Sequence, residues 1–367
     1  MMDPPDVWRM TRIRMPLIQT IDVKPVAFKL KSPFMTAAGS KTETHNVQIT
    51  LNLSDGTRGL SEASSSIAMP NESQQNMVKA LKGLTPELRG KPIENYRELV
   101  AACWRLQALH PTAAAAMECA ILDAYARALG QSLADFLGGK GTTIETDLTL
   151  SLAAPQDLFK LAKNAAKKGF RRLKVKLSGA APEEDGERMR AVHKGAPKAA
   201  LVCDGNQGFG LSQAIHFVHR LKRAQIPLVF FEQPFRKHDL RTMRLFRQRT
   251  HLPVFADEAV LSAADAVRLF EAEAADGVNI KVAKSGLLGA LDIIHIAQRF
   301  KKRLAIGCME ESKLGLAASV HLACGTGVFE WVDLDSVFLL ESTFRRGGFL
   351  MKGPKFSVKG IKSGIGI

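Results

Sequence analysis

The chain has 367 residues, of which 46% are hydrophobic, and a formal net charge of +15 at pH 7. This length supports a large buried core and more than one domain, and the charge permits binding to anionic partners. The basic residues are spread along the predicted helices, and only two Tyr and three Trp are available to stack on bases. The composition therefore disfavours nucleic-acid binding as the main function.

The cysteines and the absence of long apolar runs indicate the cellular compartment of the protein. The cysteines are odd in number, widely spaced and without a C-x-x-C pair, which favours reduced thiols over a disulfide framework or a zinc site. The charged N-terminal stretch has no apolar h-region, and no run of about 18 apolar residues follows. We therefore expect a cytoplasmic protein without a membrane segment, and a homo-oligomer is compatible with these features.

The first third of the chain mixes strand and helix patterns. Residues 21–30 and 47–53 alternate like antiparallel strands, and a turn signal, "SDGT", follows the second run. From residue 71 to about residue 138 the apolar period becomes helical and closes on a Gly-Gly pair. Strands followed by helices predict a separate α+β capping domain at residues 1–140.

After residue 141, short apolar runs alternate regularly with helical stretches. This rhythm predicts an α/β fold, a (β/α)7β-type TIM barrel at residues 141–340, with residues 341–367 packing back on the cap. An open doubly wound sheet is the alternative, but its first strand lacks a following G-x-G-x-x-G. The runs are 146–152, 171–177, 199–205, 227–234, 252–259, 276–282, 303–310 and 330–335.

A polar or functional side chain recurs near the end of each run, every 24 to 28 residues. In such barrels the catalytic rim lies at the C-terminal ends of the strands. Alternation also places Lys174 and Lys176 on one strand face, where an edge strand with solvated lysines is the alternative reading. We expect the recurring residues to share one rim: Thr149, Lys176, Asp204, Glu232, Asp257, Lys281, Met309 and Asp333.

Three of these residues, Asp204, Glu232 and Asp257, are carboxylates on consecutive predicted strands. Crowded into one barrel mouth, they would raise each other's pKa unless a cation neutralised them, and oxygen ligands of this kind suit Mg²⁺. The alternative is that they cap the helices that follow. Zinc is disfavoured because no His or Cys pair has suitable spacing.

Lysines on two sides of a metal-bound substrate suggest proton transfer. Lys176 and Lys281 lie four predicted strands apart, which places them on opposite sides of an eight-stranded barrel. A lysine base needs a lowered pKa, and the neighbouring ammonium of Lys174 can lower that of Lys176. A carbon held between the two lysines could lose a proton to one and regain it from the other, which is racemisation or epimerisation.

The motifs "KVK", "DGNQGF", "FEQPF", "ADEAV" and "NIKVAKSG", in this order, resemble the muconate-lactonizing branch of the enolase superfamily. The resemblance covers nearly the whole chain, including the helix before the barrel. It implies that Lys176 and Lys281 are the acid/base pair. By the same resemblance the metal ligands are Asp204, Glu232 and Asp257, supported by Asn206 and Glu258.

The last predicted strand indicates which of the reactions of that branch to expect. Its "DLD" places Asp333 and Asp335 on one face and resembles dipeptide epimerases, in which such a pair holds the ammonium of the substrate. A pair bonded to a basic neighbour is the alternative. The resemblance also assigns substrate contacts to Lys174, Thr149, Cys308, Met309 and Glu310.

The chain departs from L-Ala-D/L-Glu epimerases at one position. Gly39 stands where those enzymes typically place an arginine that grips the glutamate side chain. Lys41 could substitute, although a lysine does not reproduce a bidentate grip. The preferred side chain therefore stays open between glutamate, a hydrophobic residue and others.

These features together predict a Mg²⁺-dependent dipeptide epimerase. It would invert the α-carbon of the C-terminal residue of an L,L-dipeptide through a metal-stabilised enediolate. Within the same branch, the alternatives are an N-acylamino acid racemase, an o-succinylbenzoate synthase or a cycloisomerase. From another class, the alternative is a non-catalytic basic barrel that binds nucleic acid or acidic partners.

Overall fold

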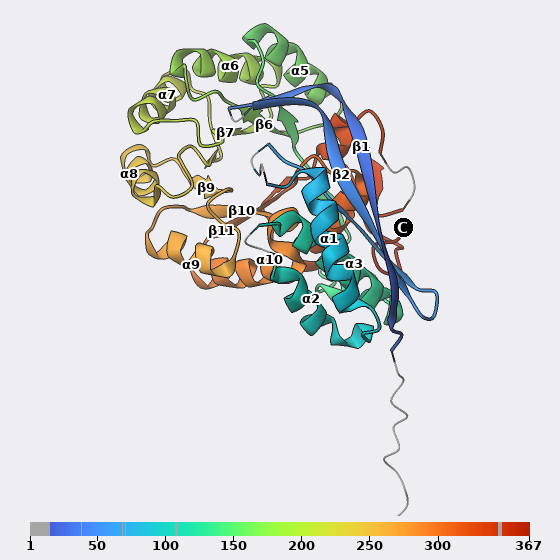
Figure 1. Cartoon of the computed structure of the whole chain (residues 1–367). Helices are drawn as coiled ribbons and strands as arrows, with labels where there is room; N and C mark the ends of the chain where they lie inside the picture. The colour runs from blue at the N-terminus through green and yellow to red at the C-terminus, as the bar shows by residue number, and fades with distance from the viewer. Residues whose placement is uncertain (1–14, 38, 68, 70, 107–108, 344–346) are drawn as a thin grey trace, which may run out of the picture.

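The computed structural model describes residues 15–37, 39–67, 69, 71–106, 109–343 and 347–367. The N-terminal stretch without an h-region falls mostly on residues 1–14, which lie outside the described residues. Figure 1 shows an N-terminal unit of long strands and helices set against a ring of strands and helices. The predicted fold class, a TIM barrel with an α+β cap, is confirmed.

The N-terminal unit is an antiparallel three-stranded sheet covered by helices. Residues Val47, Ile49 and Leu51 alternate onto the buried face of the middle strand. The first helix begins where the side chain of Ser73 accepts a hydrogen bond from the amide of Asn76. The elements are β1 (Ile18–Thr36), β2 (Gly39–Leu53), β3 (Arg58–Ala63), α1 (Gln74–Leu88), η1 (Ile93–Asn95), α2 (Tyr96–Trp104), α3 (Pro111–Ala128) and α4 (Leu133–Phe136).

The barrel sheet has eight parallel strands in the order β5 to β12. The amide of Asp147 donates to the carbonyl of Val332 (2.9 Å), so the residues before β5 meet β12 and the ring closes. The strands are β5 (Leu148–Leu150), β6 (Arg172–Lys176), β7 (Ala200–Asp204), β8 (Phe231–Glu232), β9 (Val254–Ala256), β10 (Gly277–Lys281), β11 (Arg303–Gly307) and β12 (Trp331–Asp333).

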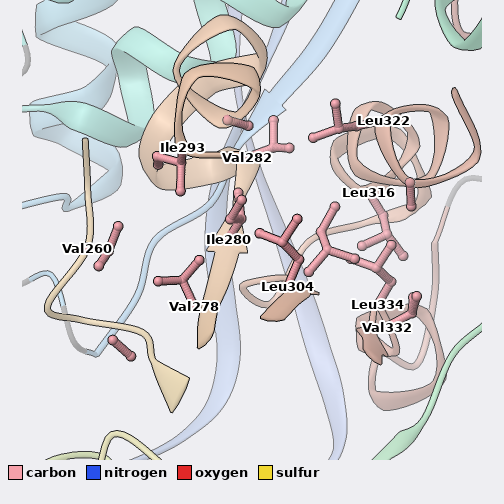
Figure 2. Packing of buried hydrophobic residues seen from close by; sticks show 14 of the residues in the cluster. Val260, Val278, Ile280, Val282, Ile293, Leu304, Leu316, Leu322, Val332 and Leu334 are labelled. Atoms are coloured by element: carbon pink, nitrogen blue, oxygen red, sulfur yellow. The ribbon is translucent and has the colours of Figure 1, made fainter. Parts of the chain in front are cut away.

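Helices follow the strands and cover the outside of the ring. Figure 2 shows Val278 and Ile280 of β10 among apolar side chains that include Ile293 of the next helix. The alternate residues of β10, Asn279 and Lys281, therefore point to the inside. The helices are α5 (Pro155–Lys167), α6 (Pro182–Gly195), α7 (Leu211–Arg223), α8 (Leu240–Thr250), α9 (Ala263–Glu271), α10 (Val282–Arg299), α11 (Lys313–Thr326) and α12 (Ser336–Leu339).

The interior of the barrel is filled one layer below the predicted rim. Phe230, Phe255 and Trp331 stand two residues before Glu232, Asp257 and Asp333, so alternation puts each aromatic on the same strand face as its acid. The first two rings stack with centroids 4.0 Å apart. This apolar floor holds the polar residues above it at the C-terminal end of the barrel.

The C-terminal segment contacts both units. Strands β13 (Leu350–Lys352) and β14 (Lys355–Ser357) form a small sheet with β4 (Thr143–Glu145). Near the C-terminus, the amide of Ile365 donates to Asp123 of α3 (2.7 Å). Among the described residues, no helix is long and apolar enough to cross a membrane.

Candidate active site

A cavity of about 300 Å³ lies between the cap and the C-terminal rim of the barrel. Its wall contains all the predicted site residues except Asp204 and Glu232, which are fully buried beside the lysines of the wall. The cap adds side chains that the sequence did not assign, and these are mainly apolar: Phe34, Ile67, Met69, Leu109 and Pro111.

The three predicted metal ligands converge. Asp204 and Glu232 end strands β7 and β8, and Asp257 directly follows β9. Each offers a carboxylate oxygen that lies within 4.8 Å of the other two. Their side chains face lysines, so the alternative that they cap the following helices is wrong. Three hard oxygen donors so close together fit Mg²⁺.

Both lysines of "KVK" point into this acidic centre, so the solvated edge-strand reading is wrong. Lys174 Nζ lies 2.8 Å from Glu232 Oε1, 2.8 Å from Asp333 Oδ2 and 3.1 Å from Asp204 Oδ2. Lys176 Nζ lies 2.6 Å from Asp204 Oδ2. Lys174 is thus shared between the carboxylate trio and the "DLD" pair.

The opposite wall carries two lysines, of which the sequence reasoning assigned one. Lys281 Nζ lies 2.7 Å from Asp257 Oδ2, and Lys284 Nζ lies 2.5 Å from Asp257 Oδ1. The signal for Lys284 was present, because a helix that starts at the strand end brings residues three apart onto one face. Asn279, also missed, donates to Glu232 Oε1 (3.0 Å) and orients that carboxylate.

The neighbouring acids control the protonation of Lys281. Burial alone would lower the pKa of Lys281, but the carboxylates of Asp257, Glu232 and Glu258 together raise that pKa above its usual value. Burial raises the pKa of Glu232 to about 8, against the pull of Lys174. The raised pKa of Lys281 is opposite to what a lysine base needs, because the carboxylate charges are balanced only by ammonium groups.

Asp333 and Asp335 form a second acidic cluster with Asp147 at the seam between β12 and β5. Asp335 lies beyond the end of β12, so the two acids do not share one strand as predicted, although both line the cavity. Thr149 connects them, since its amide donates to Asp335 Oδ2 (2.5 Å) and its hydroxyl to Asp333 Oδ1 (3.3 Å). Burial and the charge of Asp333 raise the pKa of Asp335 to about 7. A cation bound beside the two carboxylates would favour their charged forms and so offset this rise in the pKa of Asp335.

Supporting contacts hold the ligand carboxylates in place. The amide of Asn206 donates to Asp204 Oδ1 (2.8 Å), and the Asn206 side chain donates to Glu258 Oε1 (3.3 Å). Buried Gln233, which the sequence reasoning did not single out, accepts from the amide of Asp257 (3.0 Å). The Asn206 amide thus fixes how the Asp204 carboxylate points, and Gln233 holds the backbone that carries Asp257.

The cap reaches the barrel mouth at Glu310. Lys41 Nζ lies 2.7 Å from Glu310 Oε2 and donates to the carbonyl of Ser65 (3.2 Å). Lys41 is therefore engaged at the rim and is not part of the cavity wall. Gly39 has a φ of +147°, and a Cβ there would lie 3.3 Å from Ile67. Cys308 and Met309 complete this side of the wall.

A barrel with three rim carboxylates and lysines on opposite walls is the architecture of an acid/base enzyme. The family models for the mandelate racemase/muconate lactonizing enzyme N-terminal domain and for the enolase C-terminal domain-like region match residues 18–138 and 157–367. The chain belongs to this family.

Its relatives include named dipeptide epimerases. The chain is 35% identical to an L-Ala-D/L-Glu epimerase of Thermotoga maritima, covering 90% of this chain and 96% of the relative. It is 35% identical to an aromatic dipeptide epimerase of Herpetosiphon aurantiacus, covering 92% and 94%. A dipeptide epimerase of Enterococcus faecalis, solved with Mg and L-Leu-L-Tyr, superimposes with a TM-score of 0.91 at 26% identity, covering 95% and 99%.

Proposed function

We propose that the protein is a Mg²⁺-dependent dipeptide epimerase that inverts the α-carbon of the C-terminal residue of an L,L-dipeptide. The observation that carries this proposal is the placement of Lys176 and Lys281 on opposite walls of one cavity, each beside a carboxylate of the same trio. This arrangement offers a proton acceptor on one face of a carbon and a proton donor on the other.

Asp204, Glu232 and Asp257 would hold the Mg²⁺. Their oxygens are close enough to share one ion, and Asn206 and Asn279 orient the carboxylates of Asp204 and Glu232. When bound, the ion supplies positive charge that stabilises the enediolate formed at the substrate carboxylate. Lys281 would then experience less of the carboxylate charge that raises its pKa.

The chain's own residues then divide the work. One of Lys176 and Lys281 removes the α-proton and the other returns a proton to the opposite face. Lys174, held by three carboxylates, keeps a positive charge between the two acidic clusters. Asp333 and Asp335 bind the substrate ammonium, with Thr149 fixing both acids from β5.

The cap wall favours an apolar or aromatic C-terminal side chain over glutamate. Gly39 supplies no guanidinium, and the ammonium of Lys41 is taken by Glu310. The nearby wall contributes Phe34, whose ring centroid lies 6.0 Å from Lys176 Nζ, together with Ile67. Gly39, Phe34 and Ile67 offer no cation that could pair with a glutamate carboxylate.

We also propose a cytoplasmic location, because all five cysteines are unpaired and four of them are buried. The domain limits we propose are residues 1–140, 141–340 and 341–367, the last segment joining the cap through Ile365 and Asp123.

Chiral chromatography of an L,L-dipeptide incubated with the protein and Mg²⁺ tests the proposal. We expect the L,D-dipeptide to appear and EDTA to prevent it. The main rival is an N-acylamino acid racemase, which would invert an N-acylated amino acid and leave free dipeptides unchanged.

A further inference from the structure

Helix α10 is broken one turn after the lysine that ends β10. Residues 282–285 form a first helical turn, Gly286 then adopts a φ of 67° and a ψ of −176°, and the helix resumes after it. The amide groups at the start of the resumed helix have no partner within that helix. A partner has to come from elsewhere in the fold.

That partner is Glu118 of the cap helix α3. Its Oε1 accepts from the amide of Leu288 (2.6 Å), and its Oε2 accepts from Nε1 of Trp104 at the end of α2. The Glu118 side chain is 0% exposed. A Cβ on Gly286 would lie 2.2 Å from Glu118 Oε2, so the carboxylate occupies the space that a side chain would need.

This contact leads directly to the catalytic wall. Only four residues separate Gly286 from Lys281, and within them Lys284 reaches Asp257 while the hydroxyl of Ser285 donates to the carbonyl of Lys281 (3.3 Å). A change in the direction of the resumed helix is therefore passed to the backbone that carries Lys281. A displacement of about 1 Å at a reacting group can cost roughly 100-fold in rate.

The wall that carries Lys176 is held by other contacts than the wall that carries Lys281. After Lys176, the amides of Ser178 and Gly179 donate to the carboxylate of Asp185 in α6 (3.0 and 2.9 Å). Among the described residues, no hydrogen bond or ion pair joins this loop to α10 or to Glu118. The two lysines thus have separate anchors.

We propose that Glu118 is a positioning residue of the cap, which acts through the break at Gly286 to hold Lys281 in place for its half of the proton exchange. Glu118 does not line the cavity, so it acts only through α10. This inference rests on the two-lysine function proposed above. It predicts a one-sided defect, because Lys176 does not depend on Glu118.

Glu118→Gln tests this inference, because it keeps the volume of the side chain while replacing one acceptor with a donor that must face the N–H of either Trp104 or Leu288. The matched control is Asp123→Asn, which changes another buried carboxylate of α3. Asp123 accepts from the amides of Leu60 and Ile365 and binds Arg127, and all three lie outside α10. Thermal unfolding of both variants measures any general loss of stability.

The readout is the exchange of the α-proton in D₂O, measured separately from the L,L and the L,D epimer of one dipeptide. Lys281→Ala and Lys176→Ala first assign each epimer to a lysine. We expect Glu118→Gln to slow exchange of the Lys281-dependent epimer at least about 10-fold more than exchange of the other epimer. Asp123→Asn should change both epimers by the same factor.

An equal loss for both epimers, or no loss, would overturn the positioning role of Glu118. If Glu118→Gln does not fold, Trp104→Phe, which removes the indole N–H partner of the carboxylate, is measured in its place with the same criterion. If neither epimer exchanges its α-proton with the wild-type protein, the proposed function itself is overturned.

Discussion

Lys176 and Lys281 approach one cavity from strands that lie four places apart in the eight-strand order of the barrel. Lys176 Nζ contacts Asp204 and Lys281 Nζ contacts Asp257, so each lysine is held by a different member of the carboxylate trio. A carbon bound above the trio has one lysine on each face. The consequences of this arrangement can be measured.

Replacement of Lys281 should block inversion of the α-carbon while one epimer still exchanges its α-proton. Lys281→Ala should reduce epimerisation by about 100- to 10,000-fold, the contribution of a positioned acid/base group. Exchange of the α-proton in D₂O should persist for the epimer that Lys176 serves. Asp257 keeps Lys284 as a partner, so the fold should survive. Unchanged epimerisation by a folded Lys281→Ala protein would contradict the two-lysine scheme.

Asp335→Asn tests how the substrate is anchored. The asparagine oxygen can still accept from the amide of Thr149, so the change removes mainly the negative charge. We expect kcat/KM for a free dipeptide to fall about 10- to 100-fold, the loss of one hydrogen bond to a charged group. An N-acetylated dipeptide should be turned over equally by both proteins. Equal losses for both substrates would remove the ammonium-binding role.

Metal binding should raise the thermal stability of the protein. The trio of Asp204, Glu232 and Asp257 is assembled only by the fold, and Mg²⁺ at about 100 times its Kd would add roughly 2.7 kcal/mol to the free energy of unfolding. Glu232→Gln should lose most of the Mg²⁺-dependent rise in Tm, and Asp335→Asn should keep it. A rise that depends on Asp335 instead would place the ion in the second acidic cluster.

His321 should make stability depend on pH. Burial lowers its pKa to about 4, and its two ring nitrogens bond the amide of Ala134 (3.1 Å) and the carbonyl of Gly348 (2.9 Å). A histidine with a lowered pKa stabilises the fold above its unfolded pKa of about 6.5, and that contribution is lost as the pH falls toward 4.

Denaturant unfolding at several pH values measures this effect against His321→Gln, in which the group does not titrate. Between pH 6.5 and pH 4 the wild-type protein should lose up to about 3 kcal/mol more unfolding free energy than the variant. Parallel pH curves for the two proteins would show that His321 is not held neutral.

Two glycine variants compare a position where an added Cβ would clash with a position where it would meet open space. Gly286→Ala should destabilise the protein, because a Cβ there would lie 2.2 Å from Glu118 Oε2 and φ is positive. Gly83→Ala in α1, where a Cβ meets nothing within 4 Å, should stabilise it by about 0.4–1 kcal/mol. Thermal unfolding of both variants checks the prediction. A stabilising Gly286→Ala would contradict the described break in α10.

Much of the barrel could be predicted because each strand carries a local signal. The predicted run at residues 199–205 contains β7 and delivers Asp204 to the rim, and the same pattern located Glu232, Asp257 and Lys281. Each expected run contains a strand, although β8 is only two residues long. Their recurrence at the ends of successive runs was enough to place these side chains at one rim.

The contacts that were missed join segments distant in the sequence. The pairing of Lys41 with Glu310 joins positions 269 apart, and that of Glu118 with Leu288 joins positions 170 apart. No local period encodes such a pair, because it forms only after the cap docks on the barrel. Lys284 lies close to Lys281 in the sequence, and its contact with Asp257 depends on helix α10 starting directly at the end of β10.

Mass spectrometry of a library of L,L-dipeptides, incubated with the protein and Mg²⁺ in D₂O, tests the central claim most directly. We predict a gain of one mass unit on dipeptides with apolar or aromatic C-terminal residues, suppressed by EDTA. No gain on any dipeptide, together with a gain on N-acylated amino acids, would contradict the dipeptide assignment and favour the racemase.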